Sequence, residues 1–369
     1  MRRLESIDAL RGIAAAYVVV YHMMLLPNPH LVPPEWLKPV VSTGGTGVTL
    51  FFVISAFSLY YTMPKRLGET SPTLNFYLHR LFRIAPLFYT VMLLYYVRDY
   101  LLFGVLHGPK VVITNLLFLF NIFPGLQTGY VWASWTIGVE MLFYLAFPLI
   151  YRYVRNIWTA LGLFFGGALL FIVIRTIVTG TPEVFGDTNA YVQWTVFRHF
   201  PMFACGIIAF FAAEKLVLVP HEGERKGLGL FLILFSIYLY SALLGGWLPQ
   251  IFPESYYWQG VVYSLLALGC LLNPVSIIVN PLTAFLGKLS YSIYLLHPTI
   301  VYFMAPIYFW IYRVVPDYFI AFSACYLLTM SIVSALSYLT YRFVEEPGIR
   351  QGKRFMKTLE EKKSLGSAV

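Results

Sequence analysis

The first apolar segment of the chain carries two side chains that could bind an anion and move a proton. Residues 1–24 read MRRLESIDALRGIAAAYVVVYHMM, in which Arg11 and His22 interrupt an apolar stretch. On a helix these two residues lie within about 20° of the same face and about 16 Å apart along the axis. Charged or titratable groups at membrane depth are costly, so they are candidates for function. We therefore expect one helix face to present a cation near one end and an acid or base near the other.

A carboxylate stands in another apolar segment, WASWTIGVEMLFYLAFP, at residues 132–148. No basic residue follows Glu140 until Arg152, and its expected depth in a membrane matches that of His22. A carboxylate that meets an imidazole fixes the tautomer of the ring and stabilises its protonated form. The sequence therefore predicts that His22 is a general base with Glu140 as its partner. A structural pair and a proton relay are the alternatives that the residues leave open.

Two arginines stand at the start of a third apolar segment, in HRLFRIAP at residues 79–86. Arg80 and Arg83 are three residues apart and so share a helix face. Two guanidinium groups at one place suit a ligand that carries phosphate. The alternative interpretation is anchoring of the segment at the cytoplasmic membrane surface, where basic residues are common.

A fourth polar set lies late in the chain, in FLGKLSYSIYLLHP at residues 285–298. We expect Ser290 and Tyr291, near the inner end of this segment, to line a ligand cavity. His297 stands in an apolar span just before Pro298, where it is either part of the site or a core histidine that is hydrogen-bonded to a neighbour.

Two further sets of residues are interpreted as structural. Glu345 and Glu346 precede Pro347 in YRFVEEPGIR, a pattern typical of a helix stop and a membrane-surface anchor. The three cysteines stand singly in apolar segments, without pair or metal spacing, and are predicted to be buried small hydrophobes. They are Cys205, Cys270 and Cys325.

These side chains must be positioned by membrane-spanning helices, because the composition fits no soluble class. The chain has 369 residues, of which 59% are hydrophobic and only 12% charged, and its mean hydropathy is +0.71. We predict an all-α, polytopic transmembrane bundle, with a single domain over residues 1–350 and a basic cytoplasmic tail over 351–369. About ten apolar segments are long enough to span a membrane. They lie near 7–26, 46–63, 81–103, 134–154, 158–178, 196–213, 228–248, 257–279, 288–309 and 317–342.

The run at residues 111–123 is too short to cross a membrane, so a re-entrant or interfacial helix is expected there.

Several patterns are missing from the sequence. We find no cleavable signal peptide and no internal repeat of the kind seen in many transporters. There is no phosphate-binding P-loop, dinucleotide fingerprint, HExxH or GxSxG. We expect no bound metal, and any acyl or energy-carrying ligand must bind without those devices.

The distribution of basic residues predicts the orientation. If the N-terminus is cytoplasmic, nineteen of the 26 lysines and arginines fall in inner segments and six in outer ones. This asymmetry favours a multi-pass protein of the bacterial inner membrane with both termini in the cytoplasm. It also explains the net charge of +9 through attraction to anionic membrane lipids, so nucleic acid is not needed as a partner.

Taken in order, these motifs resemble those of the acyltransferase-3 family of integral membrane O-acyltransferases, over about residues 4–350. The first-helix arginine and histidine, the RxxR pair and the Trp135-to-Glu140 spacing are similar to its signatures. The other matching segments are GVTLFFVISAFSLY, with Ala56 where glycine is common, LGKLSYSIYLLHP and YRFVEEP.

The resemblance implies transfer of an acetyl or other short acyl group from cytoplasmic acyl-CoA to a hydroxyl of an extracytoplasmic or lipid-linked glycan, such as an exopolysaccharide. It implies His22 with Glu140 as the catalytic centre. It also implies that the donor is held by Arg11, Arg80 and Arg83. Some members carry a fused extracytoplasmic hydrolase-like domain, and we expect this chain to be a stand-alone membrane module.

The same comparison adds Trp135 to Tyr291 and His297 as residues expected to line the substrate path. Two other functions remain open at this point. Intramembrane arginine, histidine and glutamate equally suit a proton-coupled transporter or flippase. An acyltransferase could also act on a small amphipathic acceptor instead of a glycan.

Overall fold

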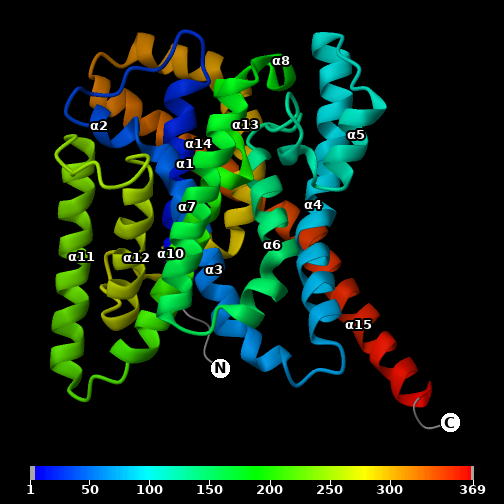
Figure 1. Cartoon of the computed structure of the whole chain (residues 1–369). Coiled ribbons are helices and arrows are strands. Elements are labelled where there is room, and N and C mark those ends of the chain that lie inside the picture. The colour runs from blue at the N-terminus through cyan, green and yellow to red at the C-terminus, as the bar shows by residue number, and fades with distance from the viewer. Residues whose placement is uncertain (1–4, 367–369) are drawn as a thin grey trace.

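The computed structural model describes the backbone of residues 5–366 and the side chains of residues 5–361. Within this range it contains helices and turns but no strand, so the predicted all-α class is confirmed. The long helices run side by side in one bundle (Figure 1).

Ten long helices coincide with the ten apolar segments of the sequence. They are α1 (Glu5–Leu25), α3 (Gly47–Arg66), α4 (Pro72–Phe103), α6 (Trp135–Tyr153), α7 (Ile157–Gly180), α10 (Val196–Leu216), α11 (Glu222–Leu244), α12 (Tyr257–Leu272), α13 (Pro281–Val314) and α14 (Tyr318–Thr340). In the described part of the chain, eight helices are long and apolar enough to cross a membrane. The helices α6 and α12 fall outside that set, and α12 is a shorter apolar helix.

Short helices connect the long ones. They are α2 (Lys38–Val41), η1 (Gly44–Thr46), α5 (Pro109–Leu116), η2 (Phe120–Ile122), α8 (Pro182–Phe185) and α9 (Thr188–Trp194). Residues 111–123 thus form most of α5 and the 3₁₀ turn η2, as expected for a run too short to cross a membrane. The three cysteines are buried and unbonded, which also confirms the prediction.

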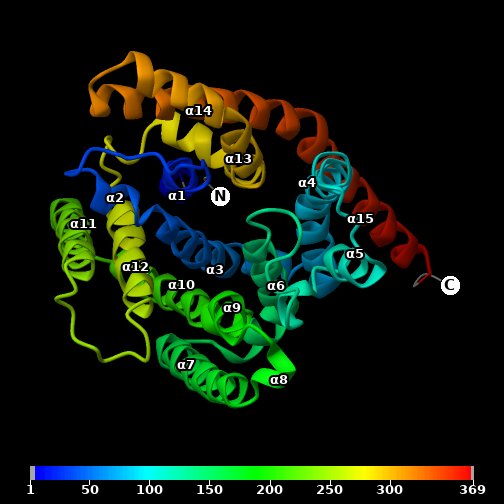
Figure 2. The ribbon, with the colours of Figure 1, turned by 90° about the horizontal axis from the view of Figure 1, so that it is seen from above.

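Helix α1 lies inside the bundle, between α13 and α3 (Figure 2). Glycines allow α1 and α13 to touch through their backbones. A Cβ atom added to Gly287 would lie 1.8 Å from the backbone oxygen of Asp8, and one added to Gly12 would lie 2.2 Å from that of Thr283. Small residues at such crossings are how membrane helices approach closely. The contact brings the polar residues of α1 against those of α13.

Replacing Gly287 with alanine is expected to destabilise the protein, because the new methyl group has no space between α1 and α13. Overpacking of this kind costs about 1–3 kcal/mol and sometimes more. Thermal unfolding of the purified protein measures the effect. The matched control is Gly166→Ala in α7, where nothing lies within 4 Å of the added atom and alanine favours the helix. Equal melting temperatures for the two variants would contradict the prediction.

The predicted helix stop near Pro347 is wrong. The chain passes from α14 through a π-helical turn, Tyr341–Glu345, directly into α15 (Glu346–Gly366). A widened turn tolerates the missing N–H of a proline that follows it, so the helix continues. Glu345, predicted to anchor at the membrane surface, is fully buried and its carboxylate accepts a hydrogen bond from Ser292.

Helix α15 packs against α4 near their crossing and then extends away from the bundle (Figure 1). A Cβ atom added to Gly352 would lie 2.6 Å from Cβ of Phe82, and one added to Gly348 would lie 2.5 Å from Cγ of Pro86. Residues 351–366, predicted as a tail, belong to this helix, and Gly352 packs against Phe82 of α4. This contact supports α4 in the segment that carries the arginine pair.

Candidate active site

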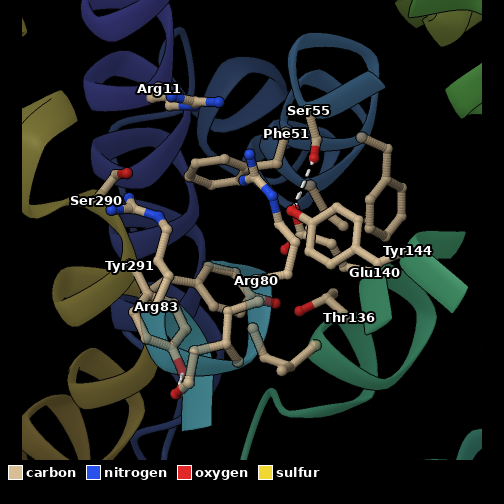
Figure 3. Close-up of a pocket in the computed structure, with 15 residues that line it drawn as sticks. Arg11, Phe51, Ser55, Arg80, Arg83, Thr136, Glu140, Tyr144, Ser290 and Tyr291 are labelled. Carbon is tan, nitrogen blue, oxygen red and sulfur yellow. Dashed lines mark hydrogen bonds between the residues drawn. The ribbon is translucent and has the colours of Figure 1, made fainter. Parts of the chain in front are cut away.

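One pocket gathers the predicted arginines and the glutamate (Figure 3). Helices α1, α3, α4, α6 and α13 form its walls. Its charged lining residues are Arg11, Arg80, Arg83 and Glu140. Three guanidinium groups and one carboxylate give the lining an excess of positive charge, which favours an anionic ligand.

The arginine pair of α4 has donors to spare. The guanidinium of Arg80 lies over the ring of Tyr144, 5.4 Å from its centroid, and its buried Nε has no hydrogen-bond partner. Among the described residues, no hydrogen bond or ion pair occupies the side chain of Arg83. Buried donors are normally satisfied in folded proteins. The free N–H groups of Arg80 and Arg83 at the pocket wall could donate hydrogen bonds to the oxygens of a phosphate group.

Arg11 is held more firmly than the pair on α4. Its Nη2 donates to Oγ of Ser58 on α3 at 3.1 Å, and its Nη1 lies 3.7 Å from the carboxylate of Asp8 on its own helix. These contacts fix the guanidinium at the pocket wall formed by α1 (Figure 3).

Glu140 projects from α6 into the pocket and has two hydroxyl partners. Oε1 accepts hydrogen bonds from Oγ of Ser55, at 2.7 Å, and from the hydroxyl of Tyr144. The predicted contact with His22 is wrong, since no hydrogen bond or ion pair joins these two described side chains. The two groups were expected at one depth, but Glu140 shares its pocket with Arg11, which lies about 16 Å from His22 along α1.

His22 pairs with another histidine instead. Its Nδ1 lies 3.1 Å from Nε2 of His297 on α13, with the ring centroids 4.9 Å apart. Each ring also has a backbone contact one turn earlier on its own helix, since Nδ1 of His22 lies 3.1 Å from the oxygen of Val18 and Nδ1 of His297 lies 3.1 Å from that of Ile293. His297 is fully buried. In the described structure, neither histidine lines the arginine pocket.

Tyr294 stands at the boundary between the pocket and the histidine pair. It lines the pocket, and its ring centroid lies 5.7 Å from that of His297 and 5.8 Å from that of Phe51. Its hydroxyl donates to the backbone oxygen of Ala133, ahead of α6. Sequence reasoning missed this residue, although its position three residues before His297 puts it on the same helix face.

The remaining predicted lining residues divide into two groups. Ser290 and Tyr291 line the pocket, and the hydroxyl of Tyr291 donates to the backbone oxygen of Ile84 on α4 at 2.8 Å. Trp135 is not part of this lining. Its ring packs against those of Trp194 and His199, at centroid distances of 4.8 Å each, so it braces the α6–α10 side of the bundle.

No metal site is found among the described residues. They contain no group of three or more histidine, cysteine, aspartate or glutamate side chains that could hold a metal ion.

Comparison with known proteins gives a family for this chain. The profile of a family described as an acyltransferase domain matches residues 4–339, which is nearly the whole chain. No solved structure matches the chain.

Individual relatives are distant. A protein of Acidianus two-tailed virus, provisionally named an acetyltransferase, is 25% identical over 79% of this chain and 81% of its own length. The O-acetyltransferase OatA of Staphylococcus aureus (strain MRSA252) is 24% identical over 98% of this chain and 60% of its own length. A provisionally named O-acetyltransferase of S. aureus (strain COL) is 22% identical over 95% of this chain and 58% of its own. The chain thus spans about three fifths of the staphylococcal relatives.

Proposed function

This chain belongs to the acyltransferase family whose profile it matches, and from that premise we propose that it transfers an acetyl or other short acyl group from acyl-CoA to an acceptor hydroxyl. The observation that carries the proposal is the convergence of Arg11, Arg80 and Arg83 on one pocket. Coenzyme A carries several phosphate groups, which such a set of guanidinium groups would bind. The names of the staphylococcal relatives support an oxygen atom as the acceptor.

The reaction divides between the pocket and the histidine pair. The arginines hold the phosphates of the donor, and its thioester end reaches past Tyr294 toward His22. His22 removes the proton of the acceptor hydroxyl as the oxygen attacks the thioester carbonyl. The carbon–sulfur bond breaks as the carbon–oxygen bond forms. The proton then passes from His22 to the leaving sulfur, which gives the ester and free coenzyme A.

In this scheme Glu140 acts through its hydrogen bonds. It accepts from Ser55 and Tyr144, and the ring of Tyr144 lies against the guanidinium of Arg80. The carboxylate therefore holds one face of the donor pocket in place, and its role is that of a positioning residue.

A pair of substitutions tests the role of Glu140. Glu140→Ala removes the acceptor of both hydroxyls and is expected to lower the rate of acyl transfer by about 10–100-fold, the equivalent of a charge-assisted hydrogen bond. Glu140→Gln keeps an oxygen in place and is expected to retain most of the activity. Initial rates with labelled acetyl-CoA measure both. A glutamine variant as inactive as the alanine variant would show that the negative charge itself is required.

We also propose that the protein lies in a plasma membrane of the bacterial inner-membrane type with both termini in the cytoplasm. The basic residues support this, although Arg2 and Arg3 lie outside the described residues. The start of α1 and the end of α15 lie toward the same side of the bundle (Figure 1). The acyl group then moves from cytoplasmic acyl-CoA to an extracytoplasmic or lipid-linked glycan.

The deciding experiment uses the purified protein in lipid nanodiscs. We expect saturable binding of acetyl-CoA and transfer of a labelled acetyl group to a hydroxyl acceptor. Mass spectrometry of cell-surface glycans, with and without the gene, is expected to show a lost acetyl group. If the protein neither binds nor consumes acetyl-CoA, the result contradicts the proposal and favours the alternative of a transporter or flippase. If cells without the gene keep their glycan acetylation and the purified protein acetylates a small amphipathic molecule, the acceptor is that class of molecule and not a glycan.

A further inference from the structure

The histidine pair has a direction, which its hydrogen bonds define. A backbone carbonyl oxygen only accepts hydrogen bonds, so the contact between Ile293 and Nδ1 of His297 requires a proton on that nitrogen. A neutral His297 then has its lone pair on Nε2, the atom that faces His22. His297 is fully buried, and none of its described contacts is with a carboxylate, so the neutral ring is the form that this environment favours.

The same logic fixes the tautomer of His22. Its Nδ1 lies 3.1 Å from Nε2 of His297, which carries the lone pair, and 3.1 Å from the carbonyl oxygen of Val18. Both neighbours are acceptors, so Nδ1 of His22 carries the proton and donates to them. A neutral His22 is therefore left with a bare Nε2, which is the basic atom of the pair.

Neighbouring rings hold the two imidazoles in this arrangement. The ring of Tyr21 meets that of His22 edge-on, with the centroids 5.2 Å apart, and Tyr294 packs beside His297 at 5.7 Å. The contacts come from both α1 and α13, whose backbones touch at Gly12 and Gly287. Rotation of either ring would break a hydrogen bond and a ring contact together.

We propose that His297 is the positioning residue that prepares His22 as a base: its Nε2 accepts a hydrogen bond from Nδ1–H of His22, which leaves Nε2 of His22 free to take the proton of the acceptor hydroxyl. This inference rests on the acyltransferase function proposed above. It gives His297 the part that the sequence had assigned to Glu140. It also makes the partner of the base a neutral ring and not a carboxylate, so the imidazolium formed during the reaction is stabilised without a counter-charge at this contact.

Two amide substitutions separate this role from simple packing. The amide of His297→Gln reaches the place of Nε2 and can accept from His22, whereas the amide of His297→Asn reaches only the place of Nδ1. We expect the asparagine variant to lose about 10²-fold in kcat, the typical worth of an oriented base. We expect the glutamine variant to stay within about tenfold of the unmodified protein, with KM for acetyl-CoA unchanged in both. Equal losses in the two variants, or no loss in the asparagine variant, would overturn the proposal.

A second measurement does not depend on activity. ¹⁵N NMR of the full protein labelled at its seven histidines, with His22→Asn for assignment, reads which ring nitrogen is protonated. We expect a protonated Nδ1 and a bare Nε2 on His22, and the reverse would overturn the assignment. If the unmodified protein transfers no acyl group, the proposed function fails, and the NMR result still decides the direction of the histidine pair.

Discussion

Replacing His22 with alanine is expected to lower kcat for acyl transfer by about 10²–10⁴-fold, the range typical of a lost general base. The variant should still bind acetyl-CoA with its normal affinity, because His22 does not line the arginine pocket of the described structure. Single-turnover transfer of a labelled acetyl group, together with calorimetric binding of acetyl-CoA, measures the two effects separately.

The matched control is His30→Ala. His30 is exposed in the loop after α1, and its Nδ1 lies 3.1 Å from the backbone oxygen of Pro27. It should leave transfer unchanged. Normal transfer by the His22 variant would remove His22 from the reaction, and a parallel loss of donor binding would mean that the substitution had disturbed the pocket.

Replacing both Arg80 and Arg83 with alanine is expected to raise the Kd for acetyl-CoA by about 10²–10⁴-fold. Each charge-assisted hydrogen bond is worth about 1.5–3 kcal/mol, and about 1.4 kcal/mol corresponds to a factor of ten. At saturating donor the rate should fall much less, since the histidine pair is untouched. Calorimetry gives the affinity, and initial rates at increasing acetyl-CoA concentration separate KM from kcat.

Arg342→Ala supplies the control for a general loss of positive charge. Arg342 lies in the turn before α15, with 57% of its side chain exposed, and pairs with Glu346 one turn later. Its loss should not change the affinity for acetyl-CoA. If the double variant of Arg80 and Arg83 also binds acetyl-CoA normally, the pocket is not the donor site.

The sequence predicted the helices and the charged residues of the pocket for one physical reason. Polar groups in an apolar helix face the interior, so Arg11, Arg80 and Glu140 were selected as site residues. The arginines were expected on the donor path and Glu140 beside His22, whereas the structure brings all three into one pocket. The pattern also selected Tyr291 as a lining residue, and the structure places it there. Their roles in binding and catalysis remain proposals.

The errors arose where the position of one helix relative to another, or the continuation of a helix, could not be read from the local sequence. His22 was paired with Glu140 by expected depth, whereas Glu140 shares a pocket with Arg11, about three helical turns away along α1, and His22 contacts His297. Glu345 was placed at the surface because Pro347 was interpreted as a stop. The π-helical turn carries the chain onward and buries the carboxylate beside Ser292. Both outcomes depend on tertiary contacts that no local pattern contains.

The position of Tyr294 has a consequence for the order of events. Its ring lines the arginine pocket and packs beside His297, so a donor bound as proposed passes this ring before its thioester meets His22. Donor binding at the arginines and acyl transfer at His22 are then two successive steps in this scheme, with a single aromatic ring between them.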